Sequence, residues 1–147
     1  MLGRKTYMLG EVDQAQRAVF RQLAAYKKLV RVIEASTSDA EVSAALDEFE
    51  PLLFNSMTLV LDRYFVHRLR VVTGKDSNPL NEVELISDSL MNNDGLLRGN
   101  NVIKLRPEET VLNVGIGEPI RVTATQFEAL AKGFFAELHG RFVQETA

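Results

Sequence analysis

The chain has 147 residues, 46% of them hydrophobic and 25% charged, so it can bury a core and is neither disordered throughout nor a collagen-like or coiled-coil rod. It contains no cysteine, which excludes disulfides, thiolate nucleophiles and cysteine-based zinc sites. Seventeen Lys and Arg against twenty Asp and Glu give a net charge of −3, which does not favour a nucleic-acid partner. This length predicts a single domain over residues 1–147.

The charges are distributed in blocks along the chain. Residues 1–35 hold seven basic and three acidic side chains, whereas residues 36–50 hold five acidic and no basic ones. We expect blocks of opposite sign to lie against one another within the fold. The first residues lack an apolar run of signal-peptide length, and the charge-free stretch at residues 51–61 is too short to cross a bilayer. The sequence therefore predicts a cytoplasmic protein with no membrane attachment.

Residues 10–35 have the pattern of an amphipathic helix, because apolar residues repeat every three or four positions from Val12 to Ile33. The opposite side of this predicted helix is basic. Its five basic residues are Arg17, Arg21, Lys27, Lys28 and Arg31. Such a face is typical of a solvated surface or of a partner for acidic helices, and phosphate binding is the alternative interpretation.

Two more helices are predicted after a short break. Ser38 and Glu41 have the spacing of a capping box for a helix over residues 39–49. Proline is tolerated in the first turn of a helix, so Pro51 permits a further helix over residues 50–73 with at most a kink at the junction. This last segment is apolar nearly all round, which predicts that it lies at the centre of the bundle.

Two final helices are predicted on either side of an irregular segment. Asn78 caps a helix that continues to Asn92, and Thr123 caps a last helix with a phenylalanine-rich face. The segment between them, residues 96–122, loses the helical period and has short alternating runs. We predict a small β-ribbon from residues 103–105, 111–116 and 120–122. The fold class is therefore mainly α, an antiparallel bundle of four to five helices with a small β-ribbon between the last two.

One group of polar residues in the predicted helix 50–73 could carry chemistry. Arg63, His67 and Arg70 project within about 60° of one another on such a helix. His67 could then act as a general acid or base, and either arginine could clamp an anion. The wider set of candidate binding residues adds the turn and helix that follow: Arg63, His67, Arg70, Lys75, Asp76, Asn78, Asn81 and Glu82.

A structural role for these residues is the simpler interpretation. An antiparallel return of the chain would bring acidic residues against the arginines, forming an ion-pair and capping network that fixes the bend between two helices. We expect Arg63 to be a buried partner of Asp62, Glu82 or Asp88, so that Arg63→Ala is clearly destabilising.

No pattern in the sequence indicates a metal or a cofactor. Neither His67 nor His139 has a second histidine or a carboxylate four residues away, as a metal site on one helix requires. No glycine-rich sequence has the spacing of a phosphate-binding loop or a dinucleotide fold. We therefore expect no metal and no cofactor, and the sequence favours a protein that is not an enzyme.

Three stretches carry a resemblance to a known family. They are the sequence from Val60 to Arg70, the turn Gly74-Lys75-Asp76 with Asn78 to Val83, and Phe134 to Leu138. Over roughly residues 50–143 the chain resembles an uncharacterised family of small single-domain bacterial proteins. The resemblance implies a bacterial cytosolic protein and supplies no catalytic residues.

A looser similarity is to the HEPN ribonucleases, helical bundles that carry an arginine, a polar residue and a histidine on one helix. The chain departs from that pattern, because only three residues separate Arg63 from His67 and Tyr64 follows the arginine. We expect a non-enzymatic helical-bundle protein that acts through self-association, as a homodimer, or through other protein interactions. The alternative is a nucleic-acid-binding or HEPN-like ribonuclease protein that uses the Arg/His strip.

Overall fold

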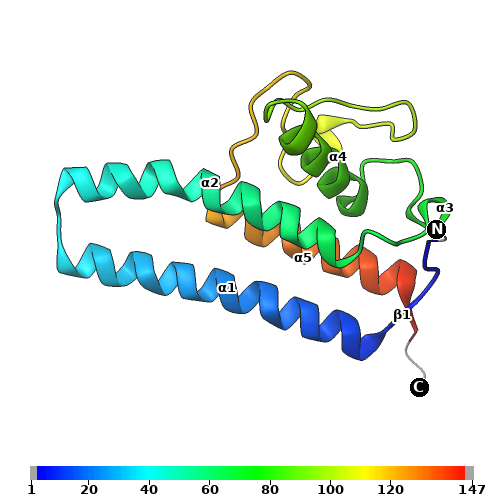
Figure 1. The fold of residues 1–147 in the computed structure, drawn as a ribbon, viewed down its shortest axis with the longest axis horizontal. Helices are drawn as coiled ribbons and strands as arrows, with labels where there is room; N and C mark the ends of the chain where they lie inside the picture. The colour runs from blue at the N-terminus through cyan, green and yellow to red at the C-terminus, as the bar shows by residue number, and fades with distance from the viewer. Residues whose placement is uncertain (1–2, 145–147) are drawn as a thin grey trace.

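The computed structural model describes residues 3–144, which fold into a mainly helical bundle (Figure 1). The predicted fold class of four to five packed helices is confirmed. None of the helices in the described part of the chain combines the length and apolar character needed to span a membrane. The elements in chain order are β1 (Tyr7–Met8), α1 (Leu9–Ser36), α2 (Ala40–Tyr64), α3 (Arg70–Thr73), α4 (Pro79–Asn92), the 3-10 turn η1 (Pro107–Glu109), α5 (Ala124–Phe142) and β2 (Val143–Gln144).

The helices α1 and α2 form a long hairpin. α1 has the predicted bounds to within one residue at each end and buries the apolar side that runs from Val12 to Tyr26. α2 starts one residue after Asp39, whose carboxylate accepts a hydrogen bond from the backbone N–H of Glu41 at 2.8 Å. Asp39 therefore caps this helix in place of the predicted Ser38. The predicted junction before Pro51 is absent, because the buried proline lies inside one continuous helix.

α5 lies at the centre of the bundle, where the sequence had placed residues 50–73. It contacts α1, α2, α3 and α4, runs antiparallel to α1 and runs parallel to α2 (Figure 1). Its buried residues Phe127, Phe134 and Phe135 are joined by rings from other elements. Phe54 of α2 lies 5.4 Å from Phe127, and Phe65 lies 5.8 Å from Phe134, measured between ring centroids. These aromatic contacts fix α5 between the two arms of the hairpin.

α2 ends at Tyr64, nine residues before the predicted end of the helix at residue 73. Beyond Tyr64 the buried ring of Phe65 packs edge-on against Tyr7, with 5.1 Å between centroids. The backbone then pairs with the N-terminal segment, because Leu69 donates to the carbonyl of Arg4 at 2.8 Å and Arg4 donates to the carbonyl of His67. These tertiary hydrogen bonds replace the helical ones and bend the chain before the short helix α3.

This pairing requires a very close approach of two backbones, and Gly3 provides it. A Cβ atom at position 3 would lie 2.7 Å from the Cα of Leu69. Gly3→Ala is therefore expected to cost about 1–3 kcal/mol of folding free energy, because the backbones must separate. Gly10→Ala is the matched control, since a Cβ there meets nothing within 4 Å. Urea unfolding of both variants checks the prediction, and equal stability of the two would contradict it.

The predicted β-ribbon within residues 96–122 does not form. Among the described residues this segment has a single antiparallel bridge, between Leu96 and Pro119, rather than pairing of residues 111–116 with 120–122. The only strands described are β1 and β2, which pair in parallel near the two ends of the chain. Backbone hydrogen bonds join residues 95–97 to 117–120 around this bridge. Asn55 of α2 then holds the segment to the helix, because its side chain accepts from the N–H of Val122 and donates to the carbonyl of Ile120, each at 3.0 Å.

Candidate functional site

The predicted Arg/His strip does not form on one helix, because α2 ends before His67. Arg63 is exposed near the end of α2, His67 is exposed in the following turn, and Arg70 begins α3. Over residues 3–144 the side chains of Arg63 and His67 make no ion pair. The prediction that Arg63 is a buried partner of carboxylates is therefore wrong.

Arg68 is the buried arginine, with only 9% of its surface exposed. Its guanidinium donates to the carbonyl of Phe65 at 2.7 Å, to the carbonyl of Leu80 at 3.2 Å and to the carboxylate of Asp62 at 3.0 Å. Glu84 of α4 lies 3.9 Å away and also pairs with Arg70. Burial, together with the nearby Arg68, lowers the pKa of Arg70. The four charges join the end of α2 to α4, so an ion-pair network does fix this bend.

Glu82 and Asp88, the other two predicted partners of Arg63, bind different groups. Asp88 pairs with Arg98 at 3.1 Å, and hydrogen bonds from Arg98 and Asn92 lower the pKa of its carboxyl. Glu82 is buried and accepts hydrogen bonds from the backbone N–H groups of Val111 and Leu112, both at 2.9 Å. Its carboxylate therefore holds the irregular segment against α4.

The turn before α4 is built by two buried asparagines. The side chain of Asn78 accepts from the N–H of Asn81 at 3.1 Å and donates to the carbonyl of Thr73 at 2.7 Å. The amide of Asn81 donates to the carbonyl of Asp76 at 2.9 Å. Lys75 and Asp76 are exposed and line an open surface hollow with residues of α5 and the irregular segment. Asn78 also donates to the carboxylate of Asp76 at 2.6 Å, so the polar atoms of both asparagines are engaged within the turn.

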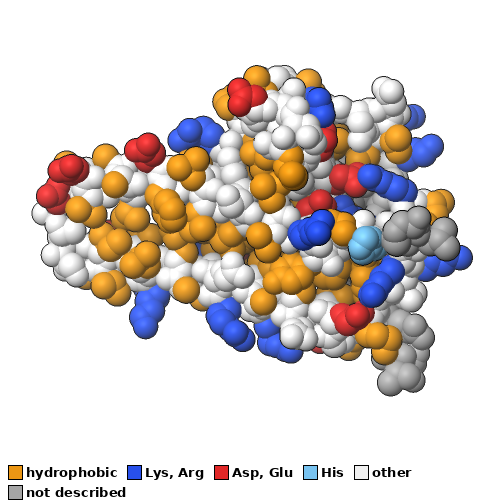
Figure 2. Space-filling model, viewed as in Figure 1, with side chains coloured by type: hydrophobic (Ala, Val, Ile, Leu, Met, Phe, Trp, Pro, Cys, Tyr) orange, Lys and Arg blue, Asp and Glu red, His pale blue; other side chains and the backbone are white. Residues whose placement is uncertain are grey.

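The exposed basic face of α1 contains four of the five predicted residues. Lys27 turns toward α5 and forms an ion pair with Glu128, whose carboxyl pKa is lowered by Lys27 and Lys132. The other four residues are exposed, and within the described part of the chain none of them forms an ion pair: Arg17, Arg21, Lys28 and Arg31. Figure 2 shows basic side chains along this edge of the molecule.

The α1–α2 hairpin extends well beyond the other helices (Figure 1). α5 begins at Ala124, whose backbone N–H donates to the carboxylate of Glu50 at 2.7 Å. Residues 28–49, which we call the hairpin tip, lie on the far side of this point. A helix of 28 residues is about 42 Å long and one of 19 residues about 28 Å, so α5 is too short to cover α1. The hairpin tip is consequently a two-helix arm without a third helix.

One side of the hairpin carries an apolar stripe, which we define as the exposed residues Leu29, Val32, Phe49 and Val60 together with the partly buried Leu53. Leu29 and Val32 are 50% and 53% exposed, and Phe49 and Val60 are 48% and 45% exposed. Residues 49, 53 and 60 have the spacing of one helix face. Figure 2 shows hydrophobic side chains gathered in a band between α1 and α2 along the hairpin. Toward the body, Val60 and Met91 line a shallow apolar hollow.

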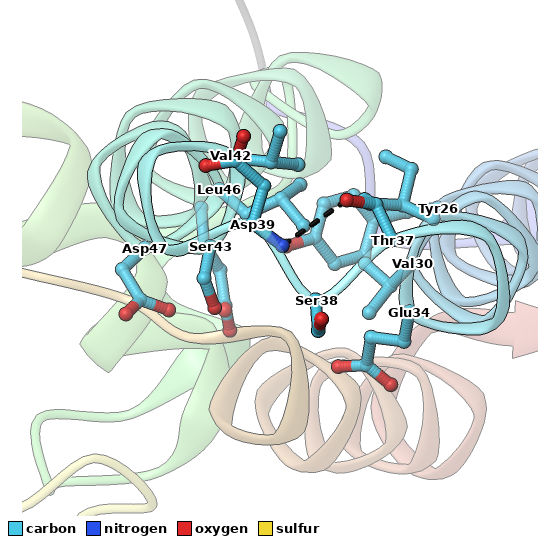
Figure 3. Close-up of a pocket in the computed structure, with 12 residues that line it drawn as sticks. Tyr26, Val30, Glu34, Thr37, Ser38, Asp39, Val42, Ser43, Leu46 and Asp47 are labelled. Atoms are coloured by element: carbon cyan, nitrogen blue, oxygen red, sulfur yellow. Dashed lines mark hydrogen bonds between the residues drawn. The ribbon is translucent and has the colours of Figure 1, made fainter.

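The other side of the hairpin tip is hollowed and acidic. A cavity of about 360 Å³ lies between the two helices and has no basic residue among those described around it. Figure 3 shows Glu34 and Asp47 pointing to the same side of the helices, with Ser38 between them. At its inner end Tyr26 is buried, and burial together with the nearby Glu50 raises the pKa of its phenol. None of the five stripe residues is among those that line this cavity.

The described residues also contain no group of three or more His, Asp or Glu close enough to hold a metal ion. Comparisons of the chain with protein-family models, with curated proteins and with solved structures found no match. The resemblance over residues 50–143 stays a prediction.

The sequence alone did not reveal the apolar stripe, because exposed and buried apolar residues give the same pattern along a helix. Residues 50–73 were predicted to be central on the ground that they are apolar all round, yet Leu52 is 62% exposed. The signal that could have found the stripe is length. The last predicted helix is shorter than the first, so it cannot cover both arms of the hairpin along their whole length.

Proposed function

We propose that the protein is a non-enzymatic helical module that acts by self-association, forming a homodimer through the apolar stripe of the α1–α2 hairpin. The observation that supports this most directly is the exposure of Leu29, Val32, Phe49 and Val60 on two adjacent helices with no element over them. Contiguous apolar patches are uncommon on monomeric proteins and mark association surfaces. A partner that laid two helices on the stripe would complete a four-helix layer.

The competing ribonuclease function loses its structural basis. It required Arg63, His67 and Arg70 on one helix, and these residues lie on α2, a turn and α3. The polar atoms of the asparagines before α4 and of Glu82 are engaged with backbone groups, which is the arrangement of a structural network. These contacts give the three side chains a role in holding the fold together.

Light scattering coupled to size exclusion, run over a range of concentrations, tests the proposal. We expect the wild-type mass to approach twice 16.5 kDa as concentration rises. The double variant Leu29→Ser/Phe49→Ser should raise the dissociation constant about tenfold or more, since tenfold corresponds to about 1.4 kcal/mol of lost apolar contact. At concentrations where wild type is monomeric, the variant should melt within a few degrees of wild type, because both side chains are half exposed in the monomer.

Ile116→Ser is the matched control for this experiment. Ile116 is 58% exposed and lies in the irregular segment, away from the hairpin. Its substitution removes a similar apolar area without touching the stripe, so the dimer should be unchanged. A wild-type mass that stays at the monomer value at every concentration would reject self-association.

A further inference from the structure

The apolar stripe lies between two edges of opposite charge. Lys28 and Arg31 are exposed on α1 and Glu41 and Glu48 on α2, and helical spacing places each pair on the side of its helix that faces away from the other helix. Over residues 3–144 none of these four side chains has an ion-pair partner. In Figure 2 basic side chains follow the lower edge of the hairpin and acidic ones lie on the upper edge near its turn, with a further basic side chain beyond them toward the body. The protein therefore presents an apolar band with a positive and a negative border.

Two copies of such a surface can meet about a two-fold axis in two ways. A two-fold contact is reciprocal, so whatever α1 touches on the partner, the partner's α1 touches on the first copy. If α1 lay on the partner's α1, the basic borders would face each other, and so would the acidic borders. If α1 lay on the partner's α2, a basic border would face an acidic border twice. Electrostatic complementarity of this kind favours the second arrangement and suppresses the first.

The positions of the charges along the helices agree with the second arrangement. A two-fold axis along the hairpin keeps both turns at the same end, so residues equally far from the turn are level. Lys28 lies eight residues before the end of α1 at Ser36, and Glu48 lies eight residues after the start of α2 at Ala40. Arg31 falls between the levels of Glu41 and Glu48. Neighbouring helices in this arrangement are all antiparallel, as in an up-and-down four-helix bundle.

We infer that the occupant of the apolar stripe is a second copy of this chain, placed with the Lys28/Arg31 edge of each copy against the Glu41/Glu48 edge of the other. This inference rests on the proposed self-association and adds which edges meet. The charged borders select a second copy over other apolar helices, because a partner needs one basic and one acidic border at matching positions.

Charge reversal tests the arrangement by light scattering at low and moderate salt. One variant is Lys28→Glu/Arg31→Glu, the second is Glu41→Lys/Glu48→Lys, and the third combines all four substitutions. Each double variant should raise the dissociation constant about tenfold or more, because both borders then carry the same sign. The combined variant should return to within about threefold of wild type, since every contact again joins opposite charges. The control Lys5→Glu/Lys104→Glu makes the same change of net charge as the first variant at exposed sites off the hairpin and should leave the dimer unchanged.

The outcomes separate this inference from the proposed function. A wild-type dimer that Leu29→Ser/Phe49→Ser disrupts, but that the double charge variants leave intact, would keep the stripe as the contact and overturn the charge pairing. A combined variant as weak as either double variant would also overturn it, because α1 would then not face the partner's α2. A monomeric wild type would reject both proposals. Salt-sensitive RNA binding by such a monomer, lost in Lys28→Glu/Arg31→Glu, would assign the basic edge to nucleic acid instead.

Discussion

Replacing Arg68 with alanine is expected to lower the free energy of unfolding by about 3–5 kcal/mol, the usual effect of removing one partner from a buried ion pair. The guanidinium is buried and binds Asp62 and the carbonyls of Phe65 and Leu80. Without it, a largely buried carboxylate and two carbonyls lose their donor together. For a chain of this size the melting temperature should fall by about 10 °C.

Arg63→Ala is the matched control for that experiment. Both variants delete an arginine near the end of α2, but Arg63 is exposed and Arg68 is not. Surface substitutions of this kind usually change stability by less than about 0.5 kcal/mol. Thermal and urea unfolding of the two variants beside wild type give the comparison. Equal stability of the two variants would mean that the Arg68 network contributes nothing net to the fold.

The position of the buried arginine could not be predicted because it depends on where α2 ends. The residues from Phe65 to Arg70 contain neither glycine nor proline, so local propensity favours continuing the helix through them. What ends it is remote in sequence, namely the backbone of Arg4 and the ring of Tyr7. A helical projection assumes an unbroken helix. Because α2 ends at Tyr64, the three strip residues do not share a helix face, and Arg68 is the arginine that becomes buried.

Elements governed by local chemistry were predicted well. The bounds of α1 follow from its apolar spacing, and the caps at Asn78 and Thr123 form as expected. The β-ribbon predicted for the irregular segment was wrong, because the structure of this segment depends on residues outside it. Its alternating runs suggested strands, but its backbone is held by side chains of Asn55 and Glu82 that lie outside it. Alternation alone does not specify a pairing partner, and here residues 117–120 pair with residues 95–97 rather than with residues 111–116.

Folding stability and self-association should depend on different residues of the α1–α2 hairpin. Most of the aromatic core lies between α5 and the body half of the hairpin, where Phe54, Phe65 and Phe134 are buried. The hairpin tip contributes little to that core. Substitutions at Leu29 or Phe49 should therefore separate the two properties, and the same is not true of residues near Phe54. The exposed face of this helix pair contributes little to the stability of the monomer, so it can form an interface with a partner.

Glu82→Gln is expected to lower the free energy of unfolding by about 1–3 kcal/mol, the usual effect of leaving a buried hydrogen-bonding group without its partner. Each carboxylate oxygen of Glu82 accepts one backbone N–H, from Val111 and from Leu112. An amide offers only one oxygen to these two donors and points its NH2 group at the other. The irregular segment should then loosen from α4, which amide hydrogen exchange at Val111 and Leu112 would report.

The same side chain should make stability depend on pH. Burial raises the pKa of Glu82 above its usual value of 4.5, more than the two backbone hydrogen bonds lower it. The folded protein therefore holds this proton at pH values where the unfolded chain has released it. Its contribution to stability is complete below the unfolded pKa and is lost as pH rises through the folded pKa. The free-energy difference between wild type and Glu82→Gln, measured by urea unfolding, should thus be larger at pH 5 than at pH 7.5. A difference that grows with pH would show instead that the fold prefers the ionised carboxylate.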